Sequence, residues 1–353
     1  MTLAQRTLRL IFTGLLLLLL ASPAAASPAP TASGVLTPDP RIQEMIDQVS
    51  STTLYNYVGG LTGETPVIVG GEPYTITTRF SLSDIPIAKA TQYAYEHFQS
   101  LGLTASYFDY YLQGFTRRNV IAEQIGLTQP GRIVLAAAHL DSTSELPYPS
   151  TLAPGADDNA SGSAGVLVAA DILSQYSFGC TLRYALFTGE EQGLYGSAAY
   201  AAAVHTLGED VAGVVNLDMI AYNTAGTAPT MELHTRHGNA GDLLLANLYS
   251  DVIAAYQIDL TPVVLQDGES ASDHYSFWQK GYPAILAIED WSDHTPFYHK
   301  TADRLQTLDM AYYTRFVKAA IGTLAHLSCL PIPTPAPARI YLPVVIELQQ
   351  LSH

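Results

Sequence analysis

Cysteine is scarce in this sequence, since Cys180 and Cys329 are the only two among 353 residues. Two thiols cannot supply a zinc cluster made of thiolates. In an exported chain the pair is expected to form one structural disulfide, because oxidising surroundings favour the bridge. Two unpaired, buried thiols are the alternative that the sequence leaves open.

Basic residues are also few. The chain has 16 lysines and arginines against 32 aspartates and glutamates, which gives a formal net charge of -16. Affinity for nucleic acid depends mainly on clustered basic side chains that contact phosphates. We therefore expect no nucleic-acid partner for this protein.

Long apolar runs are missing, apart from one near the start of the chain at 10–21. Arg6 and Arg9 precede this run, and three alanines, 24–26, follow it. A basic start, a short apolar run and small residues are typical of a cleaved signal peptide. The sequence thus predicts a signal peptide over 1–26, a secreted or extracytoplasmic mature protein, and no stable membrane span after cleavage.

The hydrophobic fraction, 48%, is sufficient for one large domain with a substantial core. A segment rich in proline, alanine, serine and threonine, 27–39, is expected to be a flexible lead-in to a domain over 40–330. The prolines of 331–338 indicate an extended spacer. The tail, 339–353, is too short to fold alone, and it either docks on the domain or acts as an export or surface-sorting tag.

Hydrophobic periodicity predicts strands that alternate with helices. Helical spacing and helix start signals occupy 41–57, 83–101, 161–176 and 309–328. Strand-like runs occupy 74–80, 107–112, 119–125, 133–138, 182–188, 211–217 and 283–289. This alternation predicts an α/β fold of three layers, with a central mixed, mainly parallel sheet and helices on both faces.

Histidine and acidic side chains follow the buried strands of the expected sheet or precede its helices. They are His139, Asp141, Asp157, Asp158, Glu190, Glu191 and Asp218. The carboxyl ends of such strands collect ligands at one edge of a sheet. Buried carboxylates are costly unless a cation compensates them. Together with His299, on a loop before the last helix, these groups predict a metal site.

Five motifs carry this chemistry. They are H-L-D-S from His139, G-A-D-D-N-A-S-G from Gly155, G-E-E-Q-G from Gly189, N-L-D-M from Asn216 and Y-H-K-T-A-D from Tyr298. In this order and spacing they resemble the cocatalytic zinc aminopeptidases of peptidase family M28, over roughly residues 40–328. Five ordered motifs are far more specific than any one alone. The resemblance implies a zinc-exopeptidase-like fold and two Zn²⁺ per chain.

The resemblance also implies which residues hold the metals. His139 and Asp218 are expected to bind one zinc, Glu191 and His299 the other, and Asp157 to bridge both. Imidazole nitrogens and carboxylate oxygens are suitable zinc ligands. His294, five residues before His299, is a rival for the last position, although His299 alone has the T-A-D sequence after it.

Further roles follow from the same likeness. Glu190 falls in the position of the general base, and Tyr298 matches a tyrosine that hydrogen-bonds the oxyanion in some members. Packing in the pocket wall is the alternative role for Tyr298. Asp141 is expected to accept the second N–H of His139 and so to fix its tautomer. A cis peptide is implied after the bridging aspartate, between Asp157 and Asp158.

The implied function is an exported aminopeptidase that removes N-terminal residues from peptides with a free N-terminus, using a water held between the metals. Met219, Phe297 and Tyr298 are expected to line an apolar pocket, which favours an apolar first residue such as leucine. A hydrolase of the same fold with another reaction, such as a carboxypeptidase, an amidohydrolase or a glutaminyl cyclase, is an alternative. A receptor-like ectodomain without catalysis is another, and the oligomeric state stays open.

Two segments are less informative. Ser272-Asp273-His274 resembles a support motif of the family, but Ser272 or Asp273 as a helix N-cap explains it equally well. The segment before it, 266–271, departs from relatives that have a tyrosine and a disulfide there, so the substrate pocket is expected to differ.

His234 is one of the histidines expected to be surface or packing residues.

Overall fold

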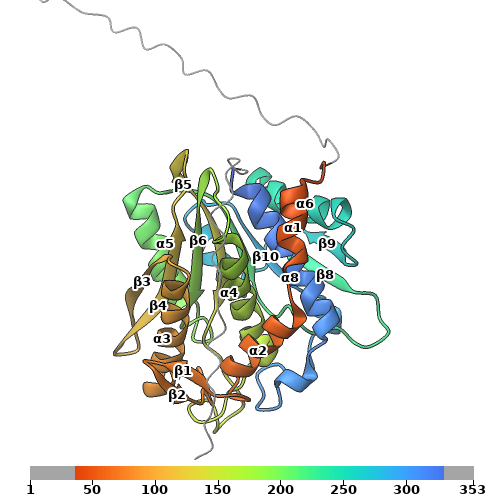
Figure 1. Cartoon of the computed structure of the whole chain (residues 1–353). Coiled ribbons are helices and arrows are strands. Elements are labelled where there is room, and N and C mark those ends of the chain that lie inside the picture. The colour runs from red at the N-terminus through yellow and green to blue at the C-terminus, as the bar shows by residue number, and fades with distance from the viewer. Residues whose placement is uncertain (1–35, 330–353) are drawn as a thin grey trace, which may run out of the picture. The chain divides into compact units, whose positions relative to one another are not determined.

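The computed structural model describes residues 36–329 (Figure 1). The expected signal peptide, the proline-rich spacer, the tail and most of the lead-in lie outside the described residues. At the end of the lead-in, Leu36 packs against the core, and the Asp39 side chain caps the first helix. Over the described range, the structure contains no helix that combines the length and the hydropathy needed to cross a membrane.

A mixed sheet of eight strands lies at the centre of the domain, in the order β3-β4-β6-β5-β7-β10-β8-β9. The strands are β3 (Thr104–Leu112), β4 (Phe115–Gln124), β5 (Gln129–His139), β6 (Cys180–Phe187), β7 (Asp210–Leu217), β8 (Thr230–His234), β9 (Thr261–Leu265) and β10 (Ala284–Glu289). Neighbours from β6 through β5 and β7 to β10 are parallel, as are β8 and β9. Strands β3, β4 and β6 pair antiparallel, and β8 is antiparallel to β10. The predicted mixed, mainly parallel sheet is confirmed.

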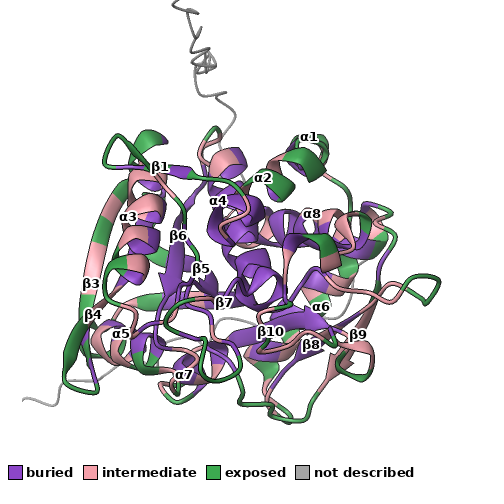
Figure 2. Cartoon of the chain, turned by 90° about the horizontal axis from the view of Figure 1, so that it is seen from below, coloured by how far each residue is buried: buried purple, intermediate pink, exposed green. Residues whose placement is uncertain are grey.

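Helices cover both faces of this sheet. One face carries α1 (Pro40–Asp47), α2 (Ser51–Leu61), α3 (Ile85–Ser100), α4 (Gly162–Leu173), α6 (Ala240–Ala255) and α8 (Met310–Leu327); the other carries α5 (Tyr195–Leu207) and α7 (His274–Trp278). Alternate residues of β5 belong to the two separate cores, with Val134 on the first face and Leu135 on the second. The three-layer arrangement is therefore confirmed, and Figure 2 shows its buried centre.

The central strands form as the sequence predicts. From Ile133 to His139 every residue of β5 is buried, and all eight residues of β6 are buried as well. A strand covered on both faces buries its odd-numbered and its even-numbered side chains, so a mostly apolar run replaces the usual alternation. Arg183 of β6 is a charged exception, and it pairs with Glu123 and Glu209. The carboxyl ends of β5 and β6 therefore deliver polar groups into a dry edge of the sheet.

The N-terminal segment differs from the prediction. The helix expected over 41–57 is two helices, because Ser50 caps a new helix with its side chain. The strand expected over 74–80 is absent. Strand β2 (Glu72–Tyr74), which pairs with β1 (Val67–Val69), ends at Tyr74, where the expected strand would begin. Beyond β2, Thr78 makes an isolated bridge and the buried Arg79 turns its guanidinium inward.

Strands β8 and β9 were not predicted. The sequence of β8, T-M-E-L-H, carries an acidic residue and a histidine at positions that face a cavity instead of the core. Its neighbour β9 is half-buried along most of its length. Both strands are only five residues long, and their structure depends on pairing, of β8 with β10 and of β9 with β8.

Cys180, which opens β6, is bonded to Cys329, which follows α8. Their Cα atoms lie 5.2 Å apart, within the usual range for a disulfide. The predicted pairing is confirmed. The bridge ties the end of the last helix to the start of a central strand.

Candidate metal centre

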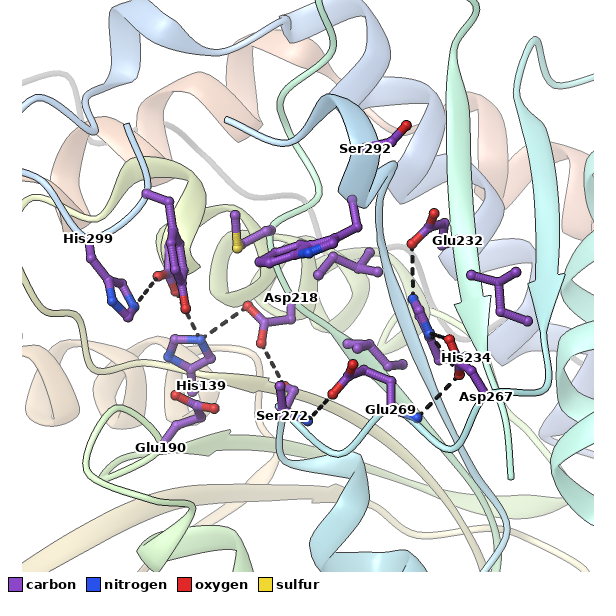
Figure 3. A pocket seen from close by; sticks show the side chains of 18 residues that line it. His139, Glu190, Asp218, Glu232, His234, Asp267, Glu269, Ser272, Ser292 and His299 are labelled. Carbon is purple, nitrogen blue, oxygen red and sulfur yellow. Dashed lines mark hydrogen bonds and ion pairs between the residues drawn. The ribbon is translucent and has the colours of Figure 1, made fainter. Parts of the chain in front are cut away.

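The carboxyl ends of the three adjacent strands β5, β6 and β7 bring together the groups that the sequence singles out. His139 is the last residue of β5, Glu190 and Glu191 follow β6, and Asp218 follows β7. The order β6-β5-β7 places these ends side by side. His299 reaches the same edge from the loop before α8 (Figure 3).

Two groups of possible metal ligands lie at this edge, and they share one residue. His139 Nε2 lies 3.1 Å from Asp218 Oδ1 and 3.2 Å from Asp158 Oδ1. His299 Nε2 lies 3.0 Å from Glu191 Oε2 and 3.1 Å from Asp158 Oδ2. Each oxygen of Asp158 thus faces a different histidine, and the two groups are joined through this carboxylate.

The shared carboxylate belongs to Asp158, so the prediction of Asp157 as the bridge is wrong by one residue. The Asp157 carboxylate accepts the backbone N–H of Ala221 at 2.9 Å and lies beside Glu289, behind the site. Between Ala156 and Ser161 the backbone leaves helical geometry at Asp158 and Asn159. Because Asp158 leaves the helical conformation, its side chain takes a different direction from that of Asp157, which separates the two neighbouring aspartates.

The cis peptide is displaced by the same single residue. It joins Asp158 to Asn159, whereas the prediction placed it between Asp157 and Asp158. It therefore still follows the aspartate that the two histidines share. The prediction assigned to Asp157 the role that Asp158 has, and the motif that contains both aspartates was identified correctly.

Asp303 holds the backbone of this turn. Its carboxylate accepts the N–H of Asp157 at 3.0 Å and the N–H of Asp158 at 3.1 Å. Asp303 is buried and is the aspartate of the T-A-D sequence that distinguishes His299 from His294. Asp303 was therefore part of the Y-H-K-T-A-D motif, but the sequence alone gave this residue no role.

Arg79 is a second support that sequence reasoning missed. Its fully buried guanidinium donates hydrogen bonds to the carbonyls of Leu140, Pro154 and Gly155 at 2.6, 2.6 and 2.9 Å. Burial lowers the pKa of Arg79 to about 10, so it remains charged at neutral pH. The side chain thus connects the segment after β5 to the turn that carries Asp158.

Asp141 lies beside His139, as predicted, but the interacting atom differs. The backbone carbonyl of Asp141 lies 3.1 Å from His139 Nδ1, while its carboxylate oxygen is 3.7 Å away. The carboxylate instead accepts the hydroxyl of Ser81 and the backbone N–H of Glu190. With Nδ1 facing a carbonyl, Nε2 is the nitrogen directed at Asp158 and Asp218.

Ser272 is also part of the site. Its hydroxyl donates a 2.6 Å hydrogen bond to Asp218 Oδ2, the oxygen that does not face His139. Asp273 occupies the N-cap position of α7, but its side chain makes no capping hydrogen bond. The N-cap role therefore does not account for Ser272, whose hydroxyl is directed at Asp218. Ser272 fixes the orientation of the Asp218 carboxylate.

The charges of the site fit a divalent cation in each group of ligands. Burial and the neighbouring Asp158 raise the pKa of Glu191 to about 7. Although burial opposes a charge on either imidazole, the carboxylates around His139 raise its pKa well above the ordinary value, and those beside His299 raise its pKa to about 10. Glu191 Oε1 is buried without a hydrogen-bond partner among the described residues. A divalent cation in each group would compensate these buried carboxylates and would compete with protons for the same atoms.

Comparison of the sequence with known protein families leads to an assignment that agrees with this geometry. The family described as peptidase family M28 matches residues 119–324, which is more than half of the chain. The chain belongs to the M28 peptidase family.

A curated relative and two solved structures are similar to this M28 chain. It is 30% identical over 224 residues to a probable leucine aminopeptidase 1 of Trichophyton verrucosum, and the match covers 60% of each chain. The LapA aminopeptidase of Legionella pneumophila superposes with a TM-score of 0.70 at 20% identity, over 86% of this chain and 79% of that one. BSAP, a zinc aminopeptidase from Bacillus subtilis, gives 0.64 at 13% identity, over 80% and 98%. At these identities the two structures show the shared fold.

Glu190 of the M28 chain lies outside both groups of ligands. It lines the cavity beside them, whereas the adjacent Glu191 faces His299. Burial and the nearby carboxylates of Glu191 and Asp218 raise the pKa of Glu190 well above its ordinary value. A carboxyl group with a high pKa, next to the ligands but not among them, is suited to proton transfer.

Tyr298 lies at the other side of the same M28 site. Its ring stacks on the imidazole of His299 with 3.7 Å between the ring centres, and it packs against Met219. Within the described part of the chain, its hydroxyl makes no hydrogen bond, so packing accounts for its observed contacts. His294 is directed elsewhere, with Nδ1 2.8 Å from the Trp291 carbonyl, and is no rival ligand.

A cavity of about 430 Å³ opens from the ligands along the sheet. Met219 and Tyr298 line it, as predicted, whereas Phe297 does not. Residues of the segment 266–271 also line the cavity, including Asp267 and Glu269, where the sequence departs from some relatives. The M28 site thus combines two groups of candidate metal ligands with an adjoining pocket.

Proposed function

We propose that this M28 chain is an exported aminopeptidase that uses two zinc ions to remove N-terminal residues from peptides. The observation that carries the proposal is the pair of ligand groups joined through Asp158, with Glu190 beside them. The proposed export rests on the signal-peptide pattern of residues 1–26.

His139 and Asp218 would hold one ion, Glu191 and His299 the other, and Asp158 both. Imidazole and carboxylate ligands in groups of three leave room for a reacting group on each ion. When bound, a zinc pair polarises a peptide carbonyl and lowers the pKa of a water molecule. The supporting bonds of Ser272 and Asp303 keep the carboxylates oriented for this task.

Glu190 is the proposed general base. Its carboxylate would take the proton from the attacking water and return it to the amine that leaves the scissile bond. The dry, acidic surroundings that raise its pKa make it able to hold that proton between the two steps. Tyr298, whose hydroxyl has no hydrogen-bond partner among the described residues, is a proposed donor to the developing oxyanion.

The acidic site also explains a preference for a free N-terminus. Carboxylates beside the ligands attract the substrate's α-ammonium group, and a blocked N-terminus lacks that charge. Met219, Tyr298 and the two β10 side chains Leu286 and Ile288 form an apolar cluster at the cavity's near end. We propose that this cluster contacts the first side chain and accepts apolar residues such as leucine.

The test compares free and N-acetylated leucine amides as substrates of the mature, zinc-loaded protein. We expect cleavage of the free substrate and little cleavage of the acetylated one. Equal cleavage of both would exclude an aminopeptidase.

Glu190→Gln is expected to retain zinc and to lose most turnover, by about a hundredfold or more. Glu72→Gln, on the exposed strand β2, is the matched control and is expected to turn over normally. Unchanged turnover in Glu190→Gln would remove Glu190 from the mechanism.

A further inference from the structure

The far end of the cavity carries a second group of charged side chains, distinct from the metal ligands. Glu232 and His234 come from β8, and Asp267 follows β9. His234 lies between the two carboxylates, with Nε2 3.1 Å from Glu232 Oε2 and Nδ1 2.9 Å from Asp267 Oδ2. Figure 3 shows this group at the opposite end of the cavity from His139 and His299.

Strand pairing fixes where this group stands relative to the site. On β10, Leu286 pairs with His234 and Ile288 with Glu232, so these side chains lie in two neighbouring rows on one face of the sheet. Strand β10 separates β8 from β7, whose end bears Asp218. Adjacent strands are about 4.8 Å apart, which places the β8 row about 10 Å from β7. An apolar row therefore lies between the metal centre and the charged row.

The charge at this end is negative. A neutral imidazole donates through one nitrogen, so His234 satisfies one of its two carboxylates unless it is protonated. Even with a charged His234, Glu232 and Asp267 leave a net charge of -1, and Glu269 lines the cavity between this end and Ser272 (Figure 3). The described residues that line the cavity include neither lysine nor arginine. An acidic substrate side chain would be repelled here, and a cationic one attracted.

The apolar row and the acidic row together match one kind of side chain. We infer that the cavity recognises an N-terminal lysine or arginine, whose methylene stem lies along Leu286 and Ile288 and whose cation reaches Glu232. Leucine fits the apolar row but is too short to reach the carboxylates. This inference rests on the proposed aminopeptidase function and narrows its substrate class: apolar first residues are accepted, and basic ones are preferred.

Glu232 is the stronger of the two determinants. Its side chain is 13% exposed, whereas that of Asp267 is 45% exposed. Water and salt screen a charge at an exposed position far more than one in a pocket. Asp267 lies at the mouth, so its contribution to selectivity is smaller.

Matched substrates separate the charge from the stem. Lysine and norleucine have the same unbranched stem with and without the ammonium group, and arginine and citrulline differ by the same charge. We expect kcat/KM of the native enzyme for lysyl p-nitroanilide to exceed that for norleucyl p-nitroanilide by about tenfold or more. The arginine to citrulline ratio should exceed one as well.

Glu232→Gln keeps the shape of the side chain and removes its charge. The lysine to norleucine ratio should then fall by about tenfold, and Asp267→Asn should lower it less. The ratio is internal to each variant, so a general loss of activity or of zinc cancels. If Glu232→Gln does not fold, the ratio of Asp267→Asn, which changes an exposed loop, decides the question.

A native lysine to norleucine ratio of one or less would overturn the inference, as would a ratio that neither variant lowers. In both cases norleucine would still be cleaved, and the aminopeptidase function would stand. If the native, zinc-loaded protein cleaves none of the four substrates, the proposed function fails first.

Discussion

Replacing Asp158 with asparagine removes the carboxylate that faces both His139 and His299. Its oxygens lie 3.2 and 3.1 Å from the two Nε2 atoms, so each metal ion would lose the charge of a shared ligand. A carboxylate charge about 4 Å from a divalent ion interacts by about 8 kcal/mol at an effective dielectric constant of 20, twice the value for two unit charges. The amide oxygen and water that replace the carboxylate offset part of this loss, so we expect Asp158→Asn to weaken zinc binding by at least about a thousandfold, since about 1.4 kcal/mol corresponds to a factor of ten.

Asp157→Asn is the matched control, because it makes the same change one residue earlier. The asparagine oxygen can still accept a hydrogen bond from the N–H of Ala221. In the native protein the Asp157 carboxylate faces neither histidine, so its loss removes no metal ligand. We expect this variant to retain its zinc with affinity within about tenfold of the native protein. Competition with a chromophoric chelator measures both affinities. Loss of zinc in Asp157→Asn but not in Asp158→Asn would refute the placement of the bridge.

Three further predictions concern the surroundings of the site and the stability of the fold. Ser272→Ala should weaken zinc binding by about tenfold to a hundredfold, because Asp218 loses its 2.6 Å hydrogen bond; equal affinity in the chelator assay would contradict this. Since carboxylates raise the pKa values of His139 and His299, protons compete with zinc, and the affinity measured by the same assay should fall as the pH falls. A loss of about tenfold per pH unit is expected for each proton displaced, and a pH-independent affinity would refute the competition. Changing Cys180 and Cys329 to alanine opens a loop with a sequence separation of 149, which should lower the free energy of unfolding by about 5 kcal/mol. Urea unfolding measures this loss, and an unchanged midpoint would argue against it.

The centre of the fold could be predicted because strands buried on both faces appear in the sequence as apolar runs. The apolar runs of β5, β6 and β7, in which Arg183 of β6 is the one charged residue within 182–188, favour strands covered on both faces. The same runs end in the polar groups of the site, so their convergence followed from the parallel order. Near the edge of the sheet the sequence lacks such an apolar run. Strand β8 pairs with β10, but its side chains Glu232 and His234 line the cavity.

The choice between Asp157 and Asp158 could not be made from composition. Two identical side chains stand next to each other, and backbone geometry alone decides which one faces the histidines. The supports were hidden for a related reason. Arg79 and Asp303 act on backbone atoms far away in the sequence, and a sequence does not display such contacts.

His234 shows the same limit at the pocket. A lone histidine on a short strand is usually a surface or packing residue, and that was the prediction. In the structure it is buried between Glu232 and Asp267, which lie 35 residues apart in sequence, and the three line the cavity together. The departure of segment 266–271 from some relatives was the one signal that this end of the pocket is unusual.

Anomalous scattering from zinc-soaked crystals, recorded on both sides of the zinc absorption edge, tests the central claim most directly. We predict two zinc peaks per chain, one among His139, Asp158 and Asp218 and the other among Asp158, Glu191 and His299. A single peak, or a pair of peaks that does not flank Asp158, would contradict the account.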